Sequence, residues 1–146
     1  MEQTRSATAT WQGDLASGSG KVSGGTGLFR DLPVSWTART EEPGGQTSPE
    51  ELLAAAHASC FNMALSGNVA RAGHRAESLR TTAAVSFTKV GDGWSVSRSE
   101  LTVRGRVPGM DEAAFLEAAN GAKDGCPISR ALAGNVELSV DATLES

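Results

Sequence analysis

One stretch of the sequence decides the fold: TSPEELLAAAHASCFNMALSGNVARAG, residues 47–73. Ser48 is a favourable helix N-cap, and Pro49 suits the first helical position. Glu51, three residues after Ser48, completes a capping box. An Ala-rich run follows, and Gly73 is a natural end for it. The stretch therefore predicts a helix of about 24 residues, which at 1.5 Å per residue is ~36 Å long.

One face of this helix carries mostly small side chains. Leu53, Ala56, Cys60, Ala64 and Gly67 recur at spacings of three and four, so we expect this face to be buried. A compact chain of 146 residues has a diameter of about 38 Å. A helix as long as the domain is wide is easier to bury between two subunits than within one, which favours a dimer.

Strands are predicted on both sides of this helix. Alternation of apolar and polar residues marks segments 7–12, 33–39, 79–90, 94–107 and 136–144, and a further strand fits residues 21–23. Gly91-Asp92-Gly93 is a turn that joins two of these strands. A shift in the apolar phase of the returning strand predicts a bulge near residues 98–100.

A second helix is predicted over residues 111–124, and a short third helix begins at Cys126-Pro127. The inward side chains of the second helix are expected to be Phe115, Leu116, Ala119 and Ala122. The chain is therefore predicted to be α+β, with antiparallel sheets, a long central helix and a second helix. Its length suits a single domain over residues 1–146.

Composition narrows the function classes. The net charge is −4 and the 13 Lys and Arg are scattered, so we expect no nucleic-acid partner. No apolar run approaches the ~20 residues needed to span a bilayer. The first 25 residues are polar and Gly-rich, unlike a secretory signal, so we expect a cytoplasmic protein. Cytosolic thiols are kept reduced, so the two cysteines are inert core thiols, metal ligands or redox catalysts.

The two cysteines stand in different settings. Cys60 is expected in mid-helix on the apolar face, where burial alone would raise its pKa and make it inert. No Lys or Arg occurs between Arg39 and Arg71, so an activating cation must come from another element or another chain. Cys126 precedes Pro127 at a helix N-terminus, where amide donors favour a thiolate. An alternative is that Cys126 only caps that helix.

A metal site is a further alternative. His57 and Cys60 are three residues apart, so they could share a zinc ion on one helix face. No Cys or His pair recurs elsewhere at metal-ligand spacing, which argues against this alternative.

Glu50 and Arg39 are candidates for chemistry near Cys60. Glu51 already has a capping task, so Glu50 is the glutamate that is freer for another one. Glu50 precedes Cys60 by ten residues, or about 15 Å along the helix, so it could only orient an arginine that reaches the sulfur. Strand alternation turns Arg39 toward solvent, and only a second layer or a partner subunit could make a site on that face.

Two motifs resemble one known family, the OsmC/Ohr hydroperoxide reductases. The segment SPEELLAAAHASCF, residues 48–61, looks like the family's signature helix, and AKDGCPIS, residues 122–129, resembles its second-cysteine motif. The segments WQGD, residues 11–14, and VPG, residues 107–109, also fit. The form Ala-His-Ala-Ser-Cys is more similar to the OsmC branch than to the Ohr branch.

The resemblance implies a role for each candidate residue. Cys60 matches the peroxidatic cysteine, Cys126 the resolving cysteine, and Glu50 the glutamate that holds a catalytic arginine, here Arg39. The fold it implies is an intertwined α+β homodimer with two sites at the subunit interface. The implied electron donor is a dithiol such as a lipoylated protein, and no flavin, haem or metal cofactor is expected.

The expected function is thus a peroxidase that protects against oxidative stress. It would reduce organic hydroperoxides, and hydrogen peroxide more weakly, through a Cys60 sulfenate and a Cys60–Cys126 disulfide. An apolar lining from Ala56, Phe61 and Met63 would favour organic peroxides. The alternative is a non-catalytic dimeric binding or structural member of the fold, whose thiols are buried and inert.

Overall fold

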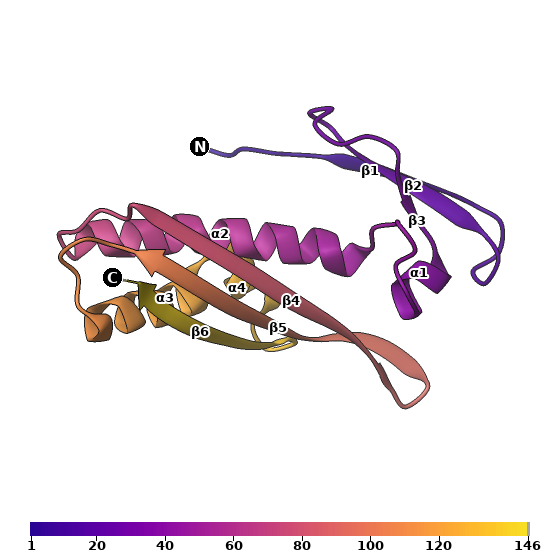
Figure 1. The fold of residues 1–146 in the computed structure, drawn as a ribbon. Helices are drawn as coiled ribbons and strands as arrows, with labels where there is room; N and C mark the ends of the chain where they lie inside the picture. Colours follow the sequence, from indigo (N-terminus) through magenta and orange to yellow (C-terminus); the bar gives the residue numbers. More distant parts are fainter. Residues whose placement is uncertain (146) are drawn as a thin grey trace. The chain divides into compact units, whose positions relative to one another are not determined.

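The structure is a computed structural model that describes residues 1–145 (Figure 1). The chain divides into two compact units, Met1–Leu52 and the remainder from Leu53 onward. The elements combine helices with one antiparallel and one mixed sheet, which confirms the predicted α+β class. The single domain expected over residues 1–146 stays a prediction.

The first unit contains a three-stranded antiparallel sheet. Its strands are β1 (Ala7–Gln12), β2 (Ser19–Gly24) and β3 (Leu32–Val34), in the order β1-β2-β3. This confirms the strands predicted at 7–12 and around 21–23. Trp11 pairs with Gly20, and a Cβ at Gly20 would lie 2.8 Å from the Trp11 ring. The glycine therefore leaves room for the indole to lie on β2.

The predicted strand over residues 33–39 is wrong beyond its first two residues. β3 ends at Val34, and a short helix, α1 (Trp36–Thr40), follows it. The Ser35 hydroxyl accepts a hydrogen bond from the Ala38 amide at 3.1 Å, so Ser35 is the N-cap of α1. The alternation of Val34 and Trp36 was too short to distinguish a strand from this turn of helix.

The long helix is confirmed as α2 (Pro49–Arg71). The Glu51 amide donates to the Ser48 hydroxyl at 3.1 Å, and the Glu51 carboxylate accepts from the Thr47 hydroxyl at 2.6 Å. Gly73, at φ 88°, follows the helix in the left-handed conformation that favours glycine.

The buried face of α2 is shifted by one position along the sequence from the predicted face. His57, Phe61, Leu65 and Val69 are fully buried, at 0% exposure each. The predicted face, which includes Cys60, is only half-buried. The large side chains bury more apolar area than the small ones, so they take the centre of the face.

The second unit contains a mixed sheet. β4 (Ser78–Val90) pairs antiparallel with β5 (Gly93–Arg106), and β5 pairs with β6 (Glu137–Glu145). The β5–β6 pairing is parallel, which the prediction of antiparallel sheets missed. Two helices, α3 (Glu112–Gly125) and α4 (Pro127–Leu132), connect β5 to β6 and supply the crossover that parallel strands need. The bulge lies at Ser97, beside the predicted position.

The core of this unit lies on one face of that sheet (Figure 1). Buried side chains from α2, β5, α3 and the loop between β5 and α3 form a single cluster: Phe61, Leu65, Val69, Leu101, Val103, Val107, Met110, Phe115, Ala119 and Ala122. Leu116 was predicted to point inward but is 37% exposed. The cluster fixes α2 and α3 against β5, and so fixes the middle of α2 and the end of α3, from which the cysteines project.

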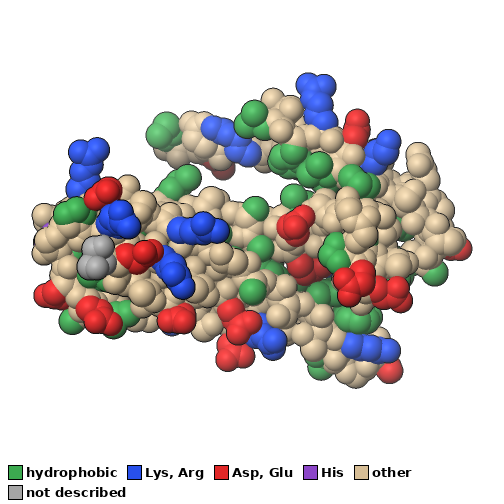
Figure 2. Space-filling view, viewed as in Figure 1, with side chains coloured by type: hydrophobic (Ala, Val, Ile, Leu, Met, Phe, Trp, Pro, Cys, Tyr) green, Lys and Arg blue, Asp and Glu red, His purple; other side chains and the backbone are tan. Residues whose placement is uncertain are grey.

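Surface features bear on two further expectations. Within residues 1–145, no helix has both the length and the apolarity needed to cross a bilayer. On the face shown in Figure 2, Lys and Arg side chains are intermixed with Asp and Glu side chains. The cytoplasmic location and the absence of a nucleic-acid partner stay predictions.

Candidate active site

The two cysteines meet in the second unit. Cys60 projects from the middle of α2, and Cys126 lies at the junction of α3 and α4, where it is the N-cap of α4. Both are free thiols, and Cys126 is fully buried while Cys60 is half-buried. Cys126 and the backbone amide of Ile128 both lie close enough to Cys60 to affect the pKa of its thiol. The helix junction therefore places the second thiol directly beside the first.

The surroundings of Cys60 disfavour its thiolate. Burial is the largest cause and raises the pKa of the Cys60 thiol. The hydrogen bond from Ile128 acts in the opposite direction, but the neighbouring Cys126 thiol raises the pKa further. Within this unit, Cys60 is therefore a poor nucleophile at neutral pH, and a reactive Cys60 needs a positive charge from elsewhere.

Arg39 and Glu50 form a second pair, within the first unit. Arg39 Nε donates to Glu50 Oε1 at 2.9 Å, and Nη2 donates to Oε2 at 2.8 Å. The Glu50 side chain is 9% exposed and that of Arg39 is 28% exposed. Arg39 was expected to turn toward solvent on a strand, but α1 directs it to the first turn of α2. Glu51, in contrast, is exposed and bonds to Thr47.

A pocket of about 370 Å³ lies beside Arg39 in the first unit. It is lined by Trp11, Leu15, Val34, Ser35, Trp36, Arg39 and Pro49. The lining is mostly apolar, with the guanidinium as its charged group, so it suits an organic molecule with one polar end. The expected lining by Phe61 is wrong, because Phe61 lies in the core at 0% exposure.

A buried chain of polar side chains extends from Cys126, and the sequence reasoning missed two of its members. His57 Nδ1 lies 2.7 Å from Ser99 Oγ, and His57 Nε2 lies 2.8 Å from Ser129 Oγ. The Cys126 thiol donates to Ser129 Oγ at 3.1 Å. All four residues have 0% exposure. Ser99 falls on the inward phase of β5, and a polar residue at such a position was the available signal.

These hydrogen bonds of His57 also bear on the zinc alternative. Both ring nitrogens of His57 are bonded to hydroxyl groups, so zinc binding would have to displace one of them. No group of three His, Cys, Asp or Glu side chains converges among residues 1–145. Burial lowers the pKa of His57, which keeps the imidazole neutral at neutral pH.

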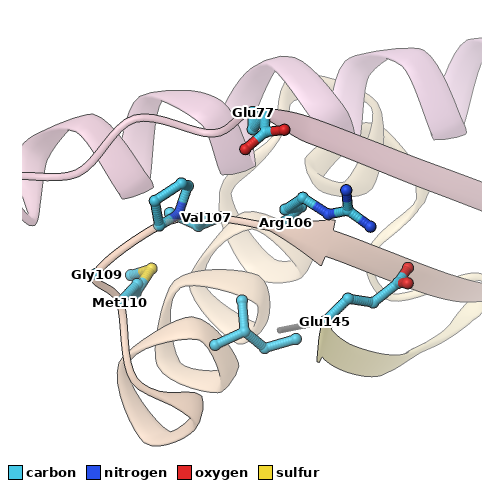
Figure 3. A pocket seen from close by; sticks show the side chains of 8 residues that line it. Glu77, Arg106, Val107, Gly109, Met110 and Glu145 are labelled. Carbon is cyan, nitrogen blue, oxygen red and sulfur yellow. The ribbon is translucent and has the colours of Figure 1, made fainter.

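Another pocket lies in the second unit (Figure 3). It has a volume of about 420 Å³ and is lined by Glu77, Arg106, Val107, Pro108, Gly109, Met110, Leu144 and Glu145. Neither cysteine is among these residues, so this pocket is separate from the thiol pair.

Comparison with known proteins gives consistent matches along the chain. A family model described as "OsmC-like protein" matches residues 42–141. The chain is 41% identical over 138 residues to the peroxiredoxin OsmC of Escherichia coli (strain K12), covering 94% of each. It is 32% identical over 117 residues to the organic hydroperoxide resistance protein OhrA of Bacillus subtilis (strain 168), covering 78% of this chain and 79% of OhrA. The crystal structure of Bacillus subtilis OhrB aligns with a TM-score of 0.70 at 25% identity, covering 94% of this chain and 98% of OhrB.

Proposed function

Because the chain belongs to the OsmC-like protein family, we propose that it is a cysteine-based peroxidase that reduces organic hydroperoxides to alcohols. Its relatives include a peroxiredoxin and an organic hydroperoxide resistance protein. The observation that carries the proposal is the proximity of Cys126 to Cys60, which is close enough to raise the pKa of the Cys60 thiol. Two thiols in contact are what a peroxidase needs to convert one oxidised sulfur into a disulfide.

The first step is attack of the Cys60 thiolate on the terminal peroxide oxygen. A sulfur–oxygen bond forms, the oxygen–oxygen bond breaks, and the alkoxide leaves with a proton as the alcohol. Cys60 becomes a sulfenic acid, two electrons more oxidised. Cys126 then attacks the Cys60 sulfur, water leaves, and a disulfide forms. A dithiol such as a lipoylated protein restores both thiols by exchange.

Arg39 is proposed to supply the positive charge that Cys60 lacks. Burial raises the pKa of the Cys60 thiol, so the reactive thiolate requires a cation beside it. Arginine side chains are always protonated, and Glu50 holds the guanidinium group of Arg39 through two hydrogen bonds. In this proposal the guanidinium both stabilises the thiolate and polarises the peroxide.

The preference for organic peroxides rests on the pocket at Arg39. Its lining includes two tryptophans, Trp11 and Trp36, which offer a large apolar surface to an organic group. Hydrogen peroxide has no such group and gains nothing from these contacts. We therefore expect hydrogen peroxide to be the weaker substrate.

The working form is proposed to be a homodimer in the cytoplasm that serves in defence against oxidative stress. The Met63 side chain is 75% exposed on the long helix α2, which is unusual for a large apolar residue and supports a subunit interface there. Analytical ultracentrifugation tests this, because a dimer has twice the 15.0 kDa mass of one chain.

A second candidate is a dimeric binding or structural protein with inert thiols. The raised pKa of Cys60, caused first by burial, favours it. This candidate predicts that replacement of Cys60 by Ser changes stability but that the native protein has no peroxidase activity to lose.

Steady-state assays distinguish the two candidates. Purified protein is given dihydrolipoamide and either cumene hydroperoxide or hydrogen peroxide, and the remaining peroxide is measured over time. The peroxidase proposal predicts consumption that favours cumene hydroperoxide and that is abolished in Cys60→Ser. Consumption no faster than in the protein-free control would overturn it.

A further inference from the structure

Three buried side chains link Cys126 to β5. Ser129 Oγ lies between the Cys126 thiol, at 3.1 Å, and His57 Nε2, at 2.8 Å. His57 Nδ1 is in turn 2.7 Å from Ser99 Oγ. The three residues come from α4, α2 and β5, and each has 0% exposure. A continuous line of hydrogen bonds therefore starts at the second thiol and ends inside the protein.

A thiol at Cys126 allows one consistent direction for the hydrogen bonds in this line. The Ser129 amide donates to the Cys126 sulfur at 3.3 Å, and the thiol proton points to Ser129 Oγ. The Ser129 hydroxyl proton is then free to point to His57 Nε2. With the ring proton on Nδ1, His57 then donates to Ser99 Oγ. In this arrangement the imidazole is neutral, with Nε2 as the acceptor that ends the line.

We propose that His57 is a positioning residue that acts through Ser129 to accept the proton of Cys126 when Cys126 condenses with oxidised Cys60. Ser129 is the contact between His57 and the reacting sulfur, and Ser99 holds the ring in the tautomer that leaves Nε2 as an acceptor. The inference rests on the proposed peroxidase function and adds to it the group that activates the second thiol.

The proton and electron count of the step balances. The thiol proton of Cys126 passes to Ser129 Oγ, and the Ser129 hydroxyl proton passes to His57 Nε2. The Cys126 sulfur donates an electron pair to the Cys60 sulfur, a sulfur–sulfur bond forms and the sulfur–oxygen bond breaks. The released hydroxide takes one proton from solvent and leaves as water, and the imidazolium gives one proton back to solvent. Cys126 is oxidised, the sulfenic sulfur is reduced, and His57 returns to its neutral form.

The residues that flank Ser99 and Ser129 place no buried charge beside His57. The neighbours of Ser99 on the flanking strands are Val85 and Leu138. Arg98 and Glu100, which flank Ser99 along β5, pair with each other at 3.1 Å with about half of each side chain exposed, 51% and 52%. Arg130, next to Ser129 on α4, is exposed. The imidazolium therefore meets no fixed positive charge there, but burial disfavours it, so His57 holds the proton only transiently.

A single-turnover experiment separates the two chemical steps. Reduced protein is mixed with one equivalent of cumene hydroperoxide; Cys60 sulfenate is measured by dimedone trapping, and disulfide by loss of free thiols. The variants are Ser129→Ala, which removes the link, and His57→Gln, which removes the acceptor. Thr81→Val is the matched control, because the Thr81 hydroxyl donates to Asn62 of α2 at 2.5 Å but is not a member of the line.

The proposal predicts a change in one step only. Sulfenate formation in Ser129→Ala and His57→Gln stays within about threefold of wild type, while disulfide closure slows by about 10²-fold, the usual size of a general-base effect. The rate of disulfide closure in these variants increases toward the wild-type rate as the pH rises, because a thiol then loses its proton to solvent without a base. Thr81→Val closes at the wild-type rate. Closure at the wild-type rate and pH profile in both variants overturns the proposal, as does an equal loss of both steps.

A second measurement is independent of turnover. In a Cys60→Ser background, Cys126 is the one remaining thiol, and its ionisation is followed by ultraviolet thiolate absorbance against pH. Adding Ser129→Ala is expected to raise the midpoint, because the thiolate loses the hydroxyl donor. An unchanged midpoint contradicts the role of the line even if the protein proves to have no peroxidase activity. If wild type forms no sulfenate, the proposed function is wrong, and the titration still tests whether Ser129 acts on Cys126.

Discussion

Arg39 holds Glu50 by two hydrogen bonds, from Nε to Oε1 at 2.9 Å and from Nη2 to Oε2 at 2.8 Å. A pair of this kind fixes the plane of the guanidinium as well as its position. The pair exists because α1 turns Arg39 back to the first turn of α2, where Glu50 is buried. An arginine held in this way can present its outer edge to a substrate without rearranging.

Replacement of Arg39 by Ala should raise the pKa of the Cys60 thiol and lower kcat/KM by about 10²-fold or more. The reason is that burial already disfavours the Cys60 thiolate, and loss of the cation leaves only the weaker effect of the Ile128 amide to oppose it. The rate of iodoacetamide alkylation of Cys60 against pH measures the change. Arg39→Lys keeps the charge but not the fork, and should fall between wild type and Arg39→Ala. An identical alkylation profile in wild type and Arg39→Ala would remove Arg39 from the mechanism.

Glu50 and Glu51 offer a matched test within one helical turn. Glu50→Gln should lower kcat/KM by about tenfold or more, because a neutral amide holds the guanidinium less firmly. Glu51→Gln should leave it near the wild-type value, since Glu51 is exposed and bonds only locally to Thr47. Steady-state kinetics with cumene hydroperoxide provide the measurement. Equal losses in the two variants would show that the effect is a general one of charge on the helix terminus.

Removal of the second thiol should leave Cys60 open to further oxidation. In Cys126→Ser the sulfenic acid cannot form the disulfide, so excess peroxide should convert it to sulfinic acid, a gain of about 32 Da for two oxygens. Wild type, which closes its disulfide, should lose two hydrogens instead. Intact-protein mass spectrometry distinguishes these products. Sulfinic acid appearing equally fast in both proteins would argue against Cys126 as the resolving thiol.

The close contact between Gly105 and Phe115 predicts a stability effect. A Cβ at Gly105 would lie 2.4 Å from the Phe115 ring, in the centre of the core. Gly105→Ala should therefore lower the free energy of unfolding by about 1–3 kcal/mol. The control is Gly125→Ala, where an added Cβ meets nothing within 4 Å and the change should stay under about 0.5 kcal/mol. Urea titration measures both, and equal stability of the two variants would contradict this packing.

Burial of neutral His57 predicts a loss of stability in mild acid. Its pKa is lowered in the folded protein from the ordinary value of 6.5, because burial disfavours the imidazolium. Below about pH 6.5 the unfolded chain then binds a proton that the folded chain does not, so stability is present above that pH and falls as the pH drops. The slope due to His57 is at most about 1.4 kcal/mol per pH unit. Urea titrations between pH 7 and pH 5 should show a steeper decline for wild type than for His57→Gln, and parallel declines would contradict the buried neutral imidazole.

Local signals in the sequence predicted much of the fold. The cap at Ser48, the stop at Gly73 and the Cys126-Pro127 helix start depend on hydrogen bonds between near neighbours, and all three are present. The parallel pairing of β6 with β5 depends on contacts far apart in the sequence, which alternation along one strand does not specify. The buried face of α2 was misplaced by one residue because His57 was not expected at a fully buried position.

In the candidate site, too, the sequence indicated single residues but not the contacts between residues that are far apart in the sequence. Cys60 and Cys126 stood out by residue type, but their contact arises only when the α3–α4 junction packs against α2. Ser99 and Ser129 gave no signal by residue type, because serine is common on surfaces and in caps; only the inward position of Ser99 on β5 could have marked it. Their significance appears only with His57, which satisfies a bond to each of them in the core.

In the proposed mechanism, peroxide oxidises Cys60 and Cys126 completes the disulfide. The most direct test is a count of free thiols with a chromogenic disulfide reagent under denaturing conditions, before and after one equivalent of cumene hydroperoxide per chain. The account predicts that wild type falls from two thiols to none, that Cys60→Ser stays at one, and that dihydrolipoamide restores both thiols of wild type. Survival of both wild-type thiols after the peroxide would contradict the account and leave Cys60 and Cys126 as inert residues of the fold.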